Sequence, residues 1–167
     1  METDPSRTLR PLPARPKGNC FGCGQANPTG LHMEFATDGQ AVYSQVVVPE
    51  HLCGWGTVVH GGIISTLLDE IMGWTAIVCC RQLVLTKSLT VDFLRPLFAG
   101  ELLQLKGEVT ARCSEREVLL EARILNPAGE QGAAGQGLFA LFTPEAARSL
   151  GFLDEAVIEQ FVQDFFS

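Results

Sequence analysis

Residues 59–70 combine side chains and backbone groups that could act on a developing negative charge. His60, Gly61 and Gly62 stand directly before an apolar segment with helical periodicity. Glycine lets a ligand approach the backbone closely. The first N–H groups of a helix have no partner inside the helix, and they carry the positive end of its dipole. We therefore expect this helix start to stabilise an oxygen that acquires negative charge.

Asp69 lies in the same apolar segment, between Leu68 and Ile71. An ionised carboxylate on an otherwise apolar helix costs free energy unless it is paired or functional. Desolvation would raise its proton affinity, which suits a general base or a nucleophile. The alternative is a buried carboxylate that caps a loop of a partner subunit. Glu70 points about a quarter-turn away and is expected at solvent or at an interface.

Gly61 and Asp69 are too far apart to serve one substrate within one chain. Eight residues of helix separate them, which is about 12 Å. A reacting group needs its oxyanion donor and its base within about 3 Å of the reacting atoms. If both residues act together, the carboxylate must come from an antiparallel second copy of the helix. The sequence then predicts a homodimer or a dimer of dimers.

The elements that would position these residues form an α+β fold. Apolar residues at three- and four-residue spacing predict one long helix over Ile63–Cys80. This helix is apolar on most sides, so we expect it to be enclosed at the centre of the molecule, with a second copy completing its burial. An amphipathic helix is expected over Leu153–Phe166. Six segments are strand-like, which predicts a mostly antiparallel sheet of five to six strands wrapped around the helix: His32–Phe35, Ala41–Val48, Leu83–Leu94, Leu102–Ala111, Val118–Asn126 and Gly132–Phe142.

Composition limits the class of protein. With 46% hydrophobic and 19% charged residues in 167, the chain is expected to be one globular domain over 18–167, after a flexible, proline-rich leader over 1–17. The net charge is −7, and only the leader is locally basic, so nucleic acid is not an expected partner. The sequence shows no uninterrupted apolar run of transmembrane length and no signal peptide. We expect a cytoplasmic protein that does not bind a membrane.

The six cysteines include one Cys-x-x-Cys pair, Cys20 and Cys23. Such a pair can be half of a zinc site or a redox pair. A structural zinc site needs two further ligands, and the sequence has no second pair at suitable spacing. His32, His51 or Cys53 could contribute only if the fold brought them close. We therefore expect reduced thiols, no metal and no cofactor.

The motifs together resemble the hotdog-fold acyl-CoA thioesterases, most closely the phenylacetic-acid-type and 4-hydroxybenzoyl-CoA-type branch. The resemblance covers about residues 20–142. It rests on a His-Gly-Gly followed, nine residues after the histidine, by Asp69, and on three longer stretches: CFGCGQANPTGL, GWGTVVHGG and TKSLTVDFLRPLFAGE. It implies a hotdog fold, with hydrolysis of an acyl-CoA or related thioester to acid and thiol at a dimer interface.

The resemblance also implies roles for single residues. The backbone N–H of Gly61 would polarise the thioester carbonyl, and Asp69 would activate water or attack the carbonyl carbon. Thr86 stands where relatives place a Ser or Thr that orients the water or the carboxylate, and His60 would shape the loop. Many relatives carry an Asn about six residues before this histidine. Cys53 or Gly54 stands there in this sequence, so a side-chain contribution to the carbonyl site is missing.

Binding of the substrate is the remaining expectation. Gly62 would line the site, and Arg95, Arg112 and Arg116 are candidates to meet the phosphates of the nucleotide. Solvated ion pairs are the alternative for these arginines. Two other activities stay open: a non-catalytic acyl-CoA-binding protein, which would not need a buried Asp69, and a hydratase, whose catalytic histidine and acid are spaced differently. The absence of GxSxG argues against an α/β-hydrolase.

Overall fold

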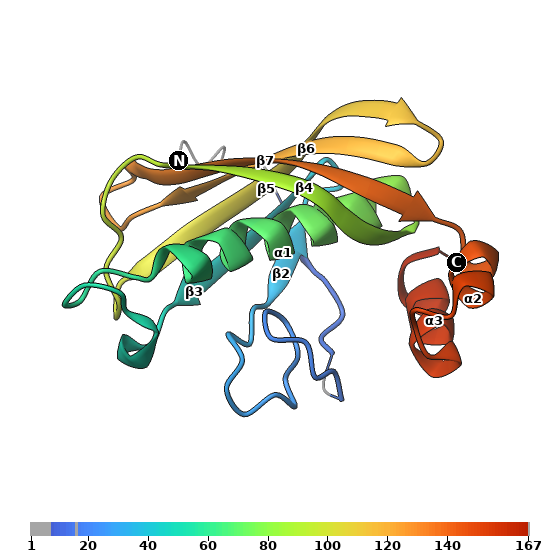
Figure 1. The fold of residues 1–167 in the computed structure, drawn as a ribbon, viewed down its shortest axis with the longest axis horizontal. Helices are drawn as coiled ribbons and strands as arrows, with labels where there is room; N and C mark the ends of the chain where they lie inside the picture. Colours follow the sequence, from blue (N-terminus) through green and yellow to red (C-terminus); the bar gives the residue numbers. More distant parts are fainter. Residues whose placement is uncertain (1–7, 16, 167) are drawn as a thin grey trace.

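A long helix lies against one face of a seven-stranded sheet (Figure 1). The computed structural model describes residues 8–15 and 17–166. Neighbouring strands are antiparallel, in the order β1-β2-β3-β5-β6-β7-β4. The strands are β1 (Arg10–Pro11), β2 (Phe35–Thr37), β3 (Ala41–Val47), β4 (Leu83–Phe93), β5 (Leu102–Ser114), β6 (Glu117–Leu125) and β7 (Gln131–Phe142). The helices are η1 (Glu50–Leu52), α1 (Gly61–Cys80), α2 (Pro144–Leu150), α3 (Glu155–Phe161) and the π-helical turn η2 (Val162–Phe166).

The predicted α+β class and the central helix are confirmed, and the strand count exceeds the predicted five to six by one short strand. In the segment expected to be a flexible leader, Arg10–Pro11 forms this edge strand on Ala36–Thr37. A proline argues against a strand because it has no backbone N–H to donate to the sheet. An edge strand tolerates it, because one side of that strand makes no hydrogen bonds to another strand. Residues 1–7 and 16 of that leader lie outside the described residues.

Helix α1 forms the centre of the core. His60 caps its start by accepting a hydrogen bond from Gly62 N–H at 2.9 Å, so the helix begins at Gly61 and not at the predicted Ile63. Arg81 ends it in the left-handed conformation. The face toward the sheet is fully buried, through Leu67, Leu68, Ile71 and Met72. This burial is the main hydrophobic contribution to the fold.

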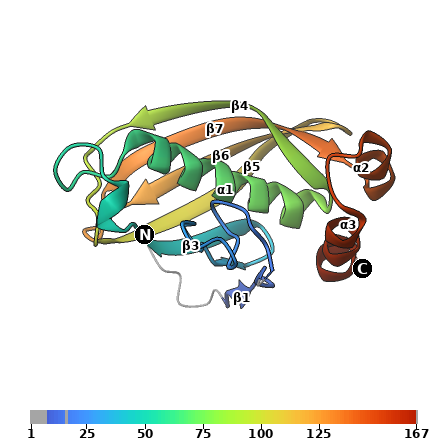
Figure 2. The same ribbon diagram turned by 60° about the horizontal axis from the view of Figure 1, so that its bottom comes forward.

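The face of α1 away from the sheet is partly covered by the chain itself, and completion of its burial by a second copy stays a prediction. The 18–31 loop crosses this face (Figures 1 and 2), and its Cys23 belongs to the core. Near the end of α1, Trp74 stacks on Phe35 and meets Phe161 and Phe165 of the C-terminal segment edge-on or tilted.

The C-terminal segment therefore docks on its own chain, and it is shorter and more broken than the predicted helix. Helix α3 covers only Glu155–Phe161. Helix α2 was not predicted, although its signals are in the sequence. Thr143 caps its start, Pro144 occupies the first turn, and Gly151 ends it in the left-handed conformation.

Within the described chain, α1 is the one helix whose length and hydropathy would allow it to cross a membrane. Half of its apolar window is buried inside the protein, against the sheet. It also carries Asp69 and Glu70. These two residues interrupt the apolar run, as the sequence indicated, and the core helix of a globular fold gives the same mean hydropathy.

Gly107 on β5 sets how closely α1 approaches the sheet, and Gly107→Ala should destabilise the protein. A Cβ there would lie 2.4 Å from Thr75 Oγ1 and 3.0 Å from the Ile71 carbonyl oxygen. Thr75 is buried and bonded to that carbonyl, so the helix must shift. We expect a loss of about 1–3 kcal/mol in the free energy of unfolding, measured by urea titration. Glu108→Ala, on the outer face, is the control and should cost less than about 1 kcal/mol.

Candidate active site

Asp69 and Thr86 are in direct contact. Thr86 Oγ1 on β4 donates a hydrogen bond of 2.7 Å to Asp69 Oδ1 on α1. The pairing of β4 with β7 is irregular between Thr86 and Ser88, and such irregularities re-aim side chains. Burial raises the pKa of Asp69 above its ordinary range, and the hydrogen bond from Thr86 opposes that rise. The pair is thus a half-buried carboxylate with raised proton affinity, held in place by a hydroxyl group.

Thr86→Val should move the acid limb of the activity profile to higher pH. The hydroxyl stabilises the ionised carboxylate, so its loss raises the pKa of Asp69 further. If the carboxylate is the active form, kcat/KM then begins to fall at a higher pH than in the wild type. A pH–rate profile measures this, with Thr86→Ser as the control that keeps the donor. An unchanged limb together with a lower Tm would show that Thr86 is only structural.

The start of α1 presents the second expected group. Within the described residues, no acceptor is found for the N–H of Gly61, whereas the next N–H is bonded to His60 Nδ1. A hollow of about 570 Å³ opens at Gly61. It is flanked by exposed apolar side chains, with Trp55 89% and Phe93 57% exposed. This end of α1 therefore combines an available hydrogen-bond donor with an apolar surface.

The predicted site residues fall into two groups within one chain. His60, Gly61 and Arg95 line the hollow at the start of α1. Thr86, Arg112 and Arg116 line a second hollow of about 1140 Å³. Because Gly61 and Asp69 lie in one continuous helix, the donor and the carboxylate remain about 12 Å apart.

The arginines are exposed and partly engaged. Arg95 Nη1 donates to the Gln131 carbonyl at 3.0 Å, and Arg112 Nη2 donates to Gln82 Oε1 at 3.1 Å. Gly62 is exposed beside its cap, His60. All three predicted arginines therefore line the two hollows, and Arg95 also makes an ion pair of 4.0 Å with Glu130, which is the solvated pair that was the alternative for this residue.

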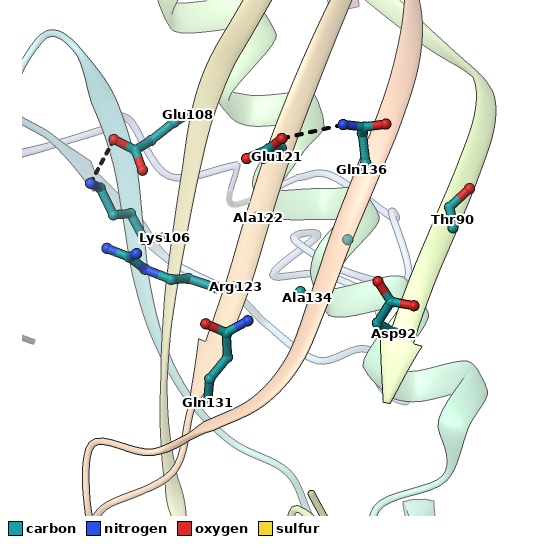
Figure 3. A pocket seen from close by; sticks show the side chains of 11 residues that line it. Thr90, Asp92, Lys106, Glu108, Glu121, Ala122, Arg123, Gln131, Ala134 and Gln136 are labelled. Carbon is teal, nitrogen blue, oxygen red and sulfur yellow. Dashed lines mark hydrogen bonds and ion pairs between the residues drawn. The ribbon is translucent and has the colours of Figure 1, made fainter. Parts of the chain in front are cut away.

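A third hollow, of about 390 Å³, lies over the outer face of the sheet (Figure 3). Its side chains are polar and pair with each other: Lys106 with Glu108, and Gln136 with Glu121. It contains none of the predicted site residues. Since acidic and basic groups alternate on it, this surface has no strong preference for an anionic ligand.

The sequence prediction for Glu70 is wrong. Its side chain faces neither solvent nor a free interface but lies against the 18–31 loop, where Cys20 Sγ and Glu70 Oε1 share a hydrogen bond of 3.0 Å. Gly22 makes this contact possible, because a Cβ there would lie 2.2 Å from Glu70 Cγ. The Cys-x-Gly-Cys spacing was the available signal, but only the fold shows that its partner is a carboxylate.

Burial, and then the hydrogen bond with Cys20, raise the pKa of Glu70 to about 8. The pKa of Cys20 is lowered to about 4, first by the hydrogen bond from the Cys23 thiol. The pKa of Cys23 is raised by that same bond and by burial. The protonation of each group therefore depends on the protonation of the other two, in one half-buried cluster.

Comparison with known proteins identifies the fold. Residues 56–125, from the loop before α1 through β6, the third strand after it, match the family model described as the thioesterase superfamily. The fold is the hotdog fold of this superfamily. A solved thioesterase superfamily protein is 24% identical with a TM-score of 0.66, over 73% of this chain and 60% of the other. This likeness confirms the hotdog fold that the motifs suggested.

Two further relatives have informative descriptions. A hypothetical thioesterase from Streptococcus pneumoniae, solved with coenzyme A, is 19% identical with a TM-score of 0.59, over 63% of this chain and 80% of the other. Verlamelin biosynthesis protein B from Lecanicillium sp is 25% identical over 123 residues, 57% of this chain and 53% of that protein. The hotdog chain thus spans about half the length of this curated relative.

Proposed function

We propose that this hotdog protein hydrolyses an acyl-CoA or a related acyl thioester to the free acid and the thiol. The observation that carries the proposal is the Asp69–Thr86 pair. The half-buried Asp69 carboxylate lies on the central helix of a hotdog fold, and the Thr86 hydroxyl on β4 holds it by a hydrogen bond. A thioester is weakly stabilised by resonance, so a carboxylate and one oriented N–H suffice to promote addition. The similarity to a thioesterase solved with coenzyme A supports CoA as the carrier.

The proposed active unit is a homodimer. Strand β4 is an edge of the sheet over 11 residues, and a long unprotected edge favours pairing with another chain. Its exposed apolar side chains include Leu85, 46% exposed, and Phe93, 57% exposed. Thr86 lies on this strand, and Phe93 lies beside Gly61. Pairing of two β4 edges would therefore place site residues of both chains at the interface, in a dimer or a dimer of dimers.

In the proposed mechanism, the Gly61 N–H of one protomer donates to the carbonyl oxygen of the thioester. Asp69 of the partner takes a proton from water as the water adds, or adds to the carbonyl carbon itself. Negative charge builds on the oxygen and is stabilised at the helix start. The carbonyl then reforms, and the thiolate leaves and takes up a proton. Where Asp69 itself has added, water then hydrolyses the acyl–aspartyl anhydride to the free acid and the Asp69 carboxylate, which Thr86 holds in place. The net reaction consumes one water.

The phosphates of CoA would bind near the second hollow. Arg112 and Arg116 line it together with Thr86 and Lys87. Glu115 and Glu117 also line it, and Lys87 is paired with Glu117, so the proposed contacts with the nucleotide rest on Arg112 and Arg116, in a protein with a net charge of −7. Arg95 lines the hollow at the start of α1. It would contact the same phosphates as Arg112 and Arg116 only if the dimer brings the two hollows together.

The test is release of free thiol from a panel of aliphatic and aromatic acyl-CoA substrates, read with a thiol reagent. We expect turnover that depends on enzyme concentration. Saturable binding without thiol release would identify a binding protein and end the proposal. Consumption of enoyl-CoA by hydration, followed by ultraviolet absorbance, would indicate a hydratase in its place.

A further inference from the structure

A second group of reactive side chains meets where the 18–31 loop crosses α1. The ligand atoms of Cys20, Cys23 and Glu70 all lie within 4.8 Å of one another. One of these contacts, between Cys20 Sγ and Glu70 Oε1, is 3.0 Å. Cys23 is only 4% exposed. The proposed hydrolysis uses none of the three, although Glu70 directly follows Asp69.

The backbone of this turn is closed by a hydrogen bond of 3.0 Å from Gly24 N–H to the Cys20 carbonyl. The absence of a side chain at Gly22 lets Glu70 approach the turn. The Glu70 carboxylate therefore lies beside the two cysteine side chains of this turn.

A bound cation would balance the charge that this cluster carries when its three groups are ionised. Among the described residues, no ion pair or hydrogen bond joins a basic side chain to Cys20, Cys23 or Glu70. Buried like charges are unfavourable unless they are paired or bind a metal.

We propose that Cys20, Cys23 and Glu70 form a zinc-binding site with three protein ligands, at the point where the 18–31 loop meets helix α1. Two thiolates and one carboxylate match the ligand preferences of Zn²⁺, whereas Mg²⁺ and Ca²⁺ prefer sites made of oxygen alone. Zinc–sulfur bonds of about 2.3 Å place tetrahedral sulfur ligands about 3.8 Å apart. The three ligand atoms therefore need to move by no more than about 1 Å. A water molecule or another small ligand fills the fourth position.

The test is the metal content and metal spectrum of the full-length protein. Protein made with added zinc should contain about one zinc per chain, and Co²⁺ in its place should give a thiolate-to-cobalt charge-transfer band. Cys20→Ser, Cys23→Ser and Glu70→Gln should each weaken zinc binding at least about 100-fold in competition with a chelating dye. Cys113→Ser, at an exposed cysteine, should bind zinc normally.

Glu70→Gln keeps both thiols and nearly the same shape, so it tests the site even if the serine variants fail to fold. Wild-type affinity in Glu70→Gln would overturn the three-ligand site. So would a protein that folds and takes up neither metal, or a Cys20–Cys23 disulfide found by mass spectrometry under the same conditions. None of these results depends on thioester hydrolysis.

Discussion

Asp69→Asn should lower kcat/KM for thioester hydrolysis by about 10²–10⁴-fold, the usual contribution of a positioned acid or base. Asparagine has nearly the same shape, and its carbonyl oxygen still accepts the 2.7 Å hydrogen bond from Thr86. What is lost is the negative charge that takes a proton or attacks carbon. Steady-state thiol release over a range of substrate concentrations measures the change.

Stability should change little in this variant. Burial already disfavours the ionised form of Asp69, so a neutral amide removes a desolvation cost. We expect the free energy of unfolding to stay within about 1 kcal/mol of wild type. Asp154→Asn is the matched control, because Asp154 is exposed and its side chain makes no cap hydrogen bond. Full activity of Asp69→Asn would exclude the carboxylate from the reaction.

The sequence predicted the part of the site that depends on local structure. The helix, its glycine-rich start and Asp69 lie in one segment, so helical geometry alone relates them. The Thr86–Asp69 contact, in contrast, depends on how β4 packs beside α1, and only the family resemblance suggested it. The irregular pairing at Thr86/Ser88 has no clear sequence signal, yet it lies next to the Thr86 hydroxyl that contacts Asp69.

The main errors concern what covers the helix. A helix that is apolar on most sides is predicted to be buried, but its hydrophobic pattern does not indicate which segments cover it. The structure assigns part of this role to the 18–31 loop and to Phe161 and Phe165 packed on Trp74. Glu70 was misplaced for the same reason. Its environment depends on a contact with Cys20, which is 50 residues away in sequence, and tertiary contacts override local patterns.

Gly61→Pro should remove the oxyanion donor while leaving the helix intact. Gly61 is the first residue of α1, the position where proline is favoured because the N–H has no helical partner. His60, with φ −60° and ψ 137°, already has the extended conformation that a following proline requires. We expect kcat to fall about 10²–10³-fold with no loss of helical circular dichroism. Gly61→Ala keeps the N–H and places its methyl in ordinary contact with Phe93, at 3.5 Å, so it should keep most of the turnover.

The two inactive variants should rescue each other if the site spans two chains. A dimer of one Asp69→Asn chain and one Gly61→Pro chain contains one site with both groups intact and one site with neither. Such heterodimers, co-expressed with two different tags and purified through both, should regain about half of the wild-type activity. If donor and carboxylate instead acted within one chain, every site of the heterodimer would lack one of them. Activity would then stay at the level of the separate variants, and the shared active site would be excluded.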